Sequence, residues 1–388
     1  MHVLTLAPFC PTAADDSSGC FIAECVGEFQ RQGIESSVIA VHPMHHSRPA
    51  PDPKAPPATW RKYLCLPGNP GLSSVGQFLH VALKFHARQL HARQPISLIH
   101  PHAALPCGQV ALLLAMDLGI PFVVTVHGLD AFSTQQVPGW FGRRCSAVCE
   151  DVYGAAARVI CISEQVARRV REGLAGPVRI GVVYNGVNTS LFSQTFGPTF
   201  SPANDLAFEN ALILSVGNLI PIKGHELLLR SVVSIVPSLP GVQCRILGDG
   251  PALVRLQELV RELRIGDRIH FLGRRSRSEV AAAMRDCALF ALNSWYEGLG
   301  WYLETMSTGR PTIACRGQGI EEVIRHGENG WLIQPKNLDD LTTALRLLLS
   351  DRPLLEQLGR KGRQTVLQGY TLAHQARQLL TIYRECLV

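Results

Sequence analysis

One segment of the chain has the composition of a phosphate site. Residues 216–224 read VGNLIPIKG and lie between a predicted strand and an apolar predicted helix. Main-chain amides at the start of a helix bind anions, and the ammonium group of a nearby lysine strengthens that binding. The segment therefore predicts that Asn218 and Lys223 contact phosphate groups. The alternative is an ordinary loop whose lysine is solvated.

Two carboxylates, seven residues apart, enclose a pair of glycines. Residues 297–304 read EGLGWYLE, with Glu297 at the start and Glu304 at the end. Seven residues of helix span about 10 Å, which is also the scale of the distance between the sugar and the ribose of a nucleotide sugar. Each carboxylate would accept hydrogen bonds from the hydroxyl groups of one ring, and Gly298 and Gly300 would let main-chain amides approach the diphosphate. The alternative is a surface helix whose acidic residues favour its N-terminus.

Two further positions follow predicted strands of the first half. His127 comes directly after residues 122–126, which read FVVTV, so we expect it at the carboxyl end of a buried strand. Ligands of such sheets bind at this end, where a histidine can contact a sugar hydroxyl. Gly19 precedes the first predicted helix, and its missing side chain would let a ligand approach the main chain. The alternatives are a hydrogen-bonded histidine at a strand terminus and an ordinary turn.

The hydrophobic pattern predicts the scaffold that must position these residues. Short apolar runs alternate with amphipathic stretches, which is typical of a parallel sheet covered by helices on both faces. We predict strands at 2–7, 36–41, 97–101, 121–126, 158–162, 179–184, 211–217, 242–247, 268–272, 288–292, 311–315 and 330–334. We predict helices at 20–33, 73–94, 105–118, 143–156, 163–174, 224–236, 251–264, 277–286, 300–308, 338–350 and 353–367. Residues 43–59 contain six prolines and predict a surface loop.

The length and the pattern together predict two domains. At 388 residues the chain is long enough for two domains of ordinary size. The alternation breaks at 186–208, which predicts a linker, and then restarts. We therefore expect an α/β protein with two doubly wound, Rossmann-like parallel-sheet domains that face each other across a cleft. Their predicted limits are 1–198 and 199–370.

Composition narrows the class of protein. Apolar residues make up 46% of the chain, which argues against disorder, and a net charge of +6 spread over both halves suits an anionic small ligand rather than nucleic acid. The twelve cysteines are scattered through apolar runs, so we expect reduced, buried thiols and no metal site. No apolar run reaches the roughly 18 residues of a membrane span, and the first residues read as a strand rather than a leader. We expect a cytoplasmic protein.

Taken together, these motifs resemble family 4 of the retaining glycosyltransferases, which have the GT-B fold. The similarity runs over most of the chain and is densest over 211–350. Further segments that carry it are 159–164, 185–188, 246–250, 271–273, 304–311, 319–324 and 327–332. Within them, residues 315–324 are similar to bacterial enzymes that build cell-surface polysaccharides.

The resemblance implies a role for each matching position. Glu297 is similar to the first glutamate of the family's two-glutamate motif, which lies against the donor sugar, and Glu304 is similar to the second, which holds the ribose. Lys223 matches the lysine that neutralises the diphosphate, and His127 matches the histidine that reaches the transferred sugar. The implied main-chain contacts to the donor come from Gly19 beneath the diphosphate, from Gly273 and Arg274 near the base, and from Gly298, Leu299 and Gly300.

Asn218 departs from the family pattern. The family usually has arginine at this position, so that an arginine and a lysine together bind the phosphates. Removing one cation from a desolvated diphosphate site weakens it unless another cation takes its place. Arg274, Arg275 and Arg316 are the candidates for that replacement.

The implied reaction moves a hexose-type sugar from a nucleotide-diphosphate sugar to a glycan or lipid-linked acceptor. The chain contains no Asp-x-Asp triplet to hold a divalent ion, so we expect a metal-independent enzyme without a cofactor, in which Glu297, His127 and Lys223 are catalytic. No carboxylate stands out as a covalent nucleophile. We therefore expect front-face attack, with the departing phosphate oxygen taking the acceptor proton, and domain closure that excludes water.

Two segments concern the surroundings of the site. Residues 73–94 contain no acid, and Phe78, Leu79, Ala82 and Phe85 share one helical face, opposite Lys84, Arg88 and His91. This predicts weak peripheral contact with the inner face of the membrane, the alternative being a half-buried helix with a solvated face. Residues 371–388 predict an amphipathic helix, and the family resemblance implies that it crosses back to the N-terminal domain.

Two other functions fit the same sequence. A nucleotide-sugar epimerase on the same fold would form its product without any acceptor. A donor-binding protein that has lost catalysis, with Asn218 as the sign of that loss, would bind nucleotide without turnover. The presence of Glu297, Glu304, Lys223 and His127 together favours the transferase.

Overall fold

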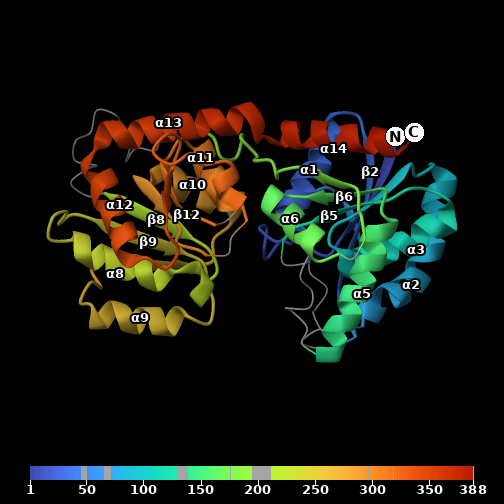
Figure 1. Ribbon diagram of the computed structural model, residues 1–388, viewed down its shortest axis with the longest axis horizontal. Helices are drawn as coiled ribbons and strands as arrows, with labels where there is room; N and C mark the ends of the chain where they lie inside the picture. Colours follow the sequence, from blue (N-terminus) through green and yellow to red (C-terminus); the bar gives the residue numbers. More distant parts are fainter. Residues whose placement is uncertain are drawn as a thin grey trace. The chain divides into compact units, whose positions relative to one another are not determined.

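The computed structural model describes residues 1–44, 50–64, 71–128, 139–174, 176–194, 211–295, 298–317 and 319–387. The chain divides into two compact units (Figure 1). The first unit combines Met1–Gly186 with Leu372–Val388, and the second is Val187–Thr371. No helix among the described residues is both long and apolar enough to cross a membrane.

The first unit is built on a parallel sheet. Its strands are β1 (His2–Ala7), β2 (Glu35–Pro43), β3 (Ala58–Tyr63), β4 (Leu98–Pro101), β5 (Val123–Val126), β6 (Arg158–Cys161) and β7 (Ile180–Val182). They pair in the orders β3-β2-β1-β4 and β5-β6-β7, and bridges from Ile99 to Phe122 and from His102 to Thr125 join β4 to β5. The chain adds strands first on one side of β1 and then on the other. The strand order therefore reverses between β1 and β4, the place where doubly wound sheets bind ligands.

Helices cover both faces of this sheet. They are α1 (Cys20–Arg31), α2 (Leu72–Arg93), α3 (Gln109–Leu118), α5 (Gly139–Ala155), α6 (Glu164–Glu172) and α14 (Leu372–Cys386). Because side chains alternate along a strand, Leu4 and Leu6 of β1 face the core that α2, α3, α5 and α6 share. Val3 faces the opposite core, where α1 contributes Phe29 and α14 contributes Tyr383.

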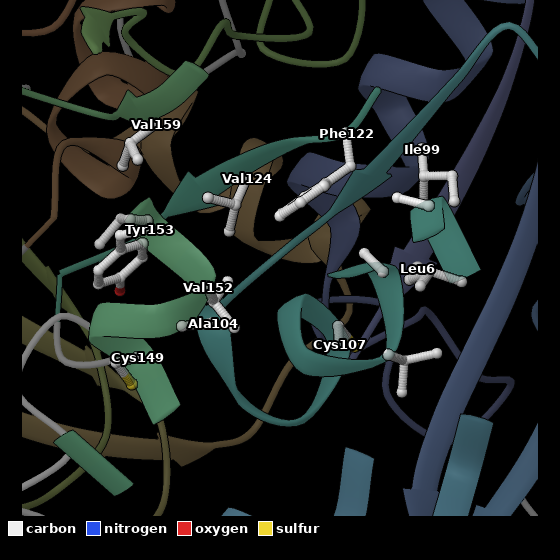
Figure 2. Packing of buried hydrophobic residues seen from close by; sticks show 14 of the residues in the cluster. Leu6, Ile99, Ala104, Cys107, Phe122, Val124, Cys149, Val152, Tyr153 and Val159 are labelled. Carbon is white, nitrogen blue, oxygen red and sulfur yellow. The ribbon is translucent and has the colours of Figure 1, made fainter. Parts of the chain in front are cut away.

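The predicted helix at 105–118 begins later than expected. A π-helical turn, Ala104–Gly108, precedes α3, and Leu105 within it has extended backbone angles. Figure 2 shows how Ala104 and Cys107 of this turn pack with Val152 of α5 and with strand residues. A Cβ on Gly108 would lie 2.7 Å from Val152, so a glycine is what lets α5 approach. The eleven cysteines in the described residues are free thiols, and nine of them are buried, which confirms their expected use in packing.

The second unit repeats the architecture. Its strands are β8 (Leu212–Val216), β9 (Gln243–Leu247), β10 (Ile269–Gly273), β11 (Leu289–Ala291), β12 (Thr312–Cys315) and β13 (Trp331–Ile333), all parallel and in the order β10-β9-β8-β11-β12-β13. Its helices are α8 (His225–Ile235), α9 (Leu253–Glu262), α10 (Arg277–Asp286), α11 (Gly300–Ser307), α12 (Leu338–Ser350) and α13 (Arg352–Gly369). The strand order reverses between β8 and β11.

Every strand expected from the sequence is present, and the described residues contain one strand that was not expected. Residues Ala58–Tyr63 form β3, which pairs with Val38–Pro43 of β2 at the edge of the sheet. The prediction of a loop over 43–59 is therefore wrong at its end. Most residues of β3 are only half-buried, so the strand lacks the apolar run by which the others were recognised.

Candidate functional site

Four loops meet at the carboxyl edge of the second sheet, and they meet main chain to main chain. The amide of Gly217, after β8, donates to Leu247, and the amide of Gly248, after β9, donates to Gly273, both at 2.9 Å. Gly248 has a φ of 139°, and a Cβ there would overlap the carbonyl oxygen of Gly217. A Cβ on Gly224 would likewise overlap the carbonyl oxygen of Asn293, after β11. Glycine is therefore required at these contacts because no side chain fits between the loops.

Lys223 lies in a short turn between β8 and α8. Its Cδ and Cγ lie 3.9 and 4.0 Å from the point that a Cβ on Gly217 would occupy, so the stem packs over the end of β8. The turn, Pro221–Lys223, is also tied to the loop after β11. The Ser294 hydroxyl and the Trp295 amide donate to the carbonyl oxygen of Ile222 at 3.3 and 3.2 Å. Asn218 is exposed at the same edge.

A histidine that sequence reasoning missed lies beneath this turn. His225, the first residue of α8, is buried, and its Nδ1 lies 3.5 Å from the hydroxyl of Ser215. Burial lowers the pKa of His225 to about 4, and the charge of Lys223 acts in the same direction. The imidazole therefore stays neutral at neutral pH, and the positive charge of this turn belongs to Lys223.

The helix α11 starts at this edge. It begins at Gly300, with buried Leu299 as its N-cap residue, and its first amides are available to an anion. A Cβ on Gly298 or Gly300 would meet no described atom within 4 Å, so there is open space in front of both. Glu297 lies outside the described residues. The helix that carries Glu304 begins at Gly300, and the expected spacing of about 10 Å between the two glutamates stays a prediction.

Glu304 is held by an arginine that the sequence did not single out. Arg277 Nη1 donates to Glu304 Oε1 at 3.0 Å, and both side chains are buried. The guanidinium also lies over the ring of Phe192, 5.2 Å from its centre. Arg277 opens α10, whose start is fixed by a capping box between Ser276 and Glu279. The carboxylate of Glu304 thus has one oxygen fixed by a charge that cannot be lost.

Each of the three arginines nominated to replace the missing cation has an interaction partner. Arg275 binds Glu279 at 3.2 Å, and Arg316 binds Glu321 at 3.3 Å. Arg274 is exposed and follows Gly273, which has a φ of 69°. The structure adds Lys336 after β13, with its Nζ 4.9 Å from the ring centre of Trp295. Its position after the last strand of the sheet was a signal available in the sequence.

Gly19 and His127 belong to the first unit, where they share the carboxyl edge of that sheet. Gly19 has a φ of 66°, and a Cβ there would lie 2.5 Å from the main chain of Phe9, so the position requires glycine. It is the N-cap residue of α1, whose Phe21 ring lies 4.7 Å from the ring of His127. His127 follows β5, as predicted.

His127 has a second histidine as its partner. Nε2 of His127 lies 2.9 Å from Nδ1 of His102, which follows β4. Burial lowers the pKa of His127 to about 4, and burial with the neighbouring His100 and His127 lowers that of His102 well below its ordinary value. Sequence reasoning missed His102, although its place after a predicted strand was the same signal that identified His127.

The outer face of α2 is apolar. Phe78, Val81 and Phe85 are 70%, 77% and 71% exposed, whereas Leu79, which the sequence grouped with the aromatics, is buried. Lys84 binds Asp117 of α3 at 2.8 Å, so it is paired rather than solvated. The helix is half-buried, and its solvated side carries these apolar side chains together with the exposed polar residues Gln77, Arg88 and Gln89.

Comparisons with known proteins show the family and the fold of the chain. The family described as Glycosyl transferases group 1 matches residues 199–365, and the one described as Glycosyltransferase Family 4 matches residues 20–191. An uncharacterized glycosyltransferase of Methanocaldococcus jannaschii is 30% identical over 69% of this chain and 70% of its own. N-acetyl-alpha-D-glucosaminyl L-malate synthase of Bacillus anthracis is 26% identical over 79% of each chain. The Anabaena protein HepE, solved with UDP, superposes with a TM-score of 0.74 at 17% identity and covers 99% of this chain and 100% of its own.

Proposed function

Because the chain belongs to family 4 of the glycosyltransferases and has the GT-B fold, we propose that it is a retaining, metal-independent hexosyltransferase. Its donor is a nucleotide-diphosphate sugar. Its acceptor is a glycan or a lipid-linked acceptor in the synthesis of a cell-surface polysaccharide.

The observation that carries this proposal is that a lysine and a helix start both lie at the carboxyl edge of the second sheet. The Lys223 turn is tied to the loop after β11 through the carbonyl of Ile222, and α11 starts at the same edge. An ammonium group and the first amides of a helix both suit a diphosphate, so in this proposal they bind it together. HepE was solved with UDP and also with UDP-glucose, which makes a UDP-sugar the first donor to test.

The proposed roles follow from chemistry at each position. Lys223 and the amides of α11 stabilise the charge that develops on the leaving diphosphate. Glu304, oriented by Arg277, accepts hydrogen bonds from the ribose hydroxyls. Glu297 and His127 contact the transferred sugar, and the leaving phosphate oxygen takes the proton of the acceptor hydroxyl on the same face of the ring.

Donor binding is tested by thermal unfolding against a panel of nucleotide sugars, with and without EDTA. A ligand that binds the folded state raises the melting temperature by mass action. We expect one donor to raise it equally with and without the chelator. A shift abolished by EDTA would contradict metal independence, and no shift with any donor would favour a protein that has lost its site.

Catalysis is tested with Glu297→Gln, using Glu258→Gln on α9 as the matched control. The control should keep full turnover, whereas Glu297→Gln should keep donor affinity and lose turnover, because the amide cannot stabilise positive charge on the sugar. Full turnover of Glu297→Gln would remove that residue from the mechanism. NMR of the product gives the anomeric configuration, and conversion of donor without acceptor would identify an epimerase instead.

The outer face of α2 supports a peripheral contact with an anionic membrane, where a lipid-linked acceptor would lie. Its three exposed apolar residues are spaced to share one face, and exposed apolar clusters of this kind mark interaction sites. Lys84 and Arg88 lie 2.8 and 4.0 Å from the single carboxylate of Asp117, so the border of the face keeps a net positive charge. Positive charge at such a border favours anionic lipid.

This contact is tested by co-sedimentation with phosphatidylglycerol vesicles and with phosphatidylcholine vesicles. We expect binding to the anionic vesicles only, and its loss in the double variant Phe78→Ser, Phe85→Ser. The control is Val254→Ser, which removes an apolar residue that is 64% exposed on α9 of the second unit. Equal sedimentation of the double variant and the control would show that α2 is not the membrane face.

A further inference from the structure

Two histidines meet at the carboxyl edge of the first sheet because their strands are neighbours. His102 bridges in parallel with Thr125, and the amide of Ala103 donates to the Thr125 carbonyl at 2.9 Å. This register places the residues that follow β4 and β5 side by side. His102 Nδ1 and His127 Nε2 are 2.9 Å apart, a normal hydrogen-bond length.

The two rings meet edge to edge. Their planes are within 18° of each other, and their centres are 5.1 Å apart. If the hydrogen bond lies in the plane of both rings, the centres are farther apart than the bonded nitrogens by one ring radius on each side, which is about the width of one ring. The observed centre distance exceeds the 2.9 Å between the nitrogens by about this amount, so the shared hydrogen bond lies close to both ring planes. An in-plane bond is the geometry in which an imidazole N–H donates well to an imidazole nitrogen.

A third histidine keeps this pair from turning. The ring of His100 lies 4.5 Å from that of His102, and both of its nitrogens are engaged. Nε2 of His100 is 2.7 Å from the hydroxyl of Thr125, and Nδ1 is 2.5 Å from the hydroxyl of Tyr383 on α14. On the other side, Phe21 packs against His127 at 4.7 Å. A row of rings from Tyr383 to Phe21 thus fixes the plane in which His127 can lie.

The pairing also links the protonation of the two rings. A neutral imidazole carries one N–H, so in a bond between two neutral imidazoles one ring donates and the other accepts. Burial lowers the pKa of His100 to about 3 and that of His127 to about 4, which keeps these rings neutral near neutral pH. Whichever ring donates, the tautomer of His127 is then determined by the tautomer of His102.

We propose that His102 is a positioning residue that fixes the ring and the tautomer of His127, so that His127 meets the donor sugar through Nδ1 and not through Nε2. The inference rests on the proposed function, because it takes His127 to be the residue that reaches the sugar. Its observation is independent of that function: Nε2 is already occupied by the bond to His102.

Asparagine and glutamine substitutions distinguish the function of Nδ1 from that of Nε2 in each ring. The amide of asparagine lies near the position of Nδ1, and that of glutamine lies near the position of Nε2. His102→Asn can therefore keep a partner for His127, whereas His102→Leu cannot. His127→Asn keeps a group for the sugar, whereas His127→Gln keeps only a group for His102. The matched control is His270→Asn, at an exposed histidine of β10 that binds Gln243 in the second unit.

The activity test measures kcat and KM for the donor together with the affinity for the free nucleoside diphosphate. We expect His102→Leu to lower kcat/KM by roughly 10- to 100-fold, since a misplaced contact costs about that much. Diphosphate affinity should stay unchanged, because Lys223 and the amides of α11 lie in the second unit and Gly19 would contact the diphosphate only through its main chain. His102→Asn should recover most of the loss, and His127→Asn should be more active than His127→Gln. An unchanged kcat/KM in His102→Leu, or no recovery in a folded His102→Asn, would overturn the proposal.

A second measurement does not depend on turnover. The ¹⁵N imidazole spectrum of the labelled protein reports the tautomer of each histidine, and the variants assign the signals. We expect one tautomer of His127 in the wild type and a mixture in His102→Leu. A mixture in the wild type would refute the positioning role even in an active enzyme. If His127 has a single tautomer that depends on His102 but the protein turns over no donor, the pairing is supported and only the proposed function fails.

Discussion

Removing the charge of Lys223 should produce the clearest change in affinity for the nucleoside diphosphate. We consider Lys223→Met, which keeps a stem that can pack over Gly217 and removes the ammonium group. The turn itself should survive, because Ser294 and Trp295 anchor it through the carbonyl of Ile222 and not through the lysine side chain. The variant therefore tests charge with little change in packing.

The expected size of the effect follows from one charge-assisted hydrogen bond. Such a bond contributes roughly 1.5–3 kcal/mol, and about 1.4 kcal/mol corresponds to a factor of ten in affinity. Lys223→Met should therefore weaken binding of the nucleoside diphosphate by roughly 10- to 150-fold. Because Asn218 carries no charge, we expect a value toward the upper part of this range, with Asn218→Arg restoring part of the loss.

Titration calorimetry with the nucleoside diphosphate and with the corresponding nucleoside provides the assay. Only the diphosphate should lose affinity, since the nucleoside has no group for Lys223 to bind. Lys361→Met on α13 is the control and should change neither value. Equal losses for both ligands would mean that the variant disturbs the fold of the loop. No loss for the diphosphate would refute the assignment of Lys223, and cations such as Lys336 would then be the next to test.

Three further predictions concern packing, space and protons. Arg277→Met should destabilise the second unit by about 3–5 kcal/mol in urea unfolding, because it leaves the carboxylate of Glu304 buried without its cation; adding Glu304→Gln should recover part of this, and a neutral single variant would contradict the pairing. Gly248→Ala should lower the melting temperature, because its Cβ overlaps the Gly217 carbonyl, whereas Gly298→Ala should keep the melting temperature and weaken donor binding. The reverse pattern would show that the donor does not bind in the open space at Gly298. For His100, the folded pKa of about 3 lies below the ordinary 6.5, so its stabilising contribution is complete above that ordinary value and is lost as the pH falls toward the folded one. His100 should contribute about 1.4 kcal/mol per pH unit to the loss of stability in that window. His102, His127 and His225, whose pKa values are also lowered, add slopes of their own. Urea unfolding of His100→Gln should therefore show a slope that is smaller by about the share of one group; an unchanged slope would assign it to the other groups.

The scaffold was predictable because its signals are local. An apolar run such as Val3 to Ala7 is buried throughout in a parallel sheet, and the run alone is enough to predict the strand. β3 was not predicted, because Arg61 and Lys62 interrupt its apolar character at the edge of the sheet. The late start of α3 also escaped, because the extended conformation of Leu105 interrupts a stretch whose composition favours helix.

The partners within the candidate site could not be predicted in the same way. Arg277 and Glu304 lie on different helices, 27 residues apart, and only the folded chain brings them to 3.0 Å. His102 and His127 meet because β4 pairs with β5. The order of strands in a sheet cannot be deduced from the sequence of any single strand. The sequence therefore indicated which residues have suitable chemistry, while the contacts that orient them depend on topology.

The position of α14 in the chain has a consequence for synthesis. Leu372–Val388 belongs to the same compact unit as Met1–Gly186, with the whole of the second unit encoded between them. Val3, Phe29 and Leu98 pack against Tyr383 and its neighbours, so the part of this face that α14 covers stays exposed until that helix leaves the ribosome. The second unit is continuous and can complete its core earlier, whereas domains encoded first usually fold first. A nascent chain of this protein would therefore finish its domains in the reverse of the order in which they begin, with an apolar surface that needs protection in the interval.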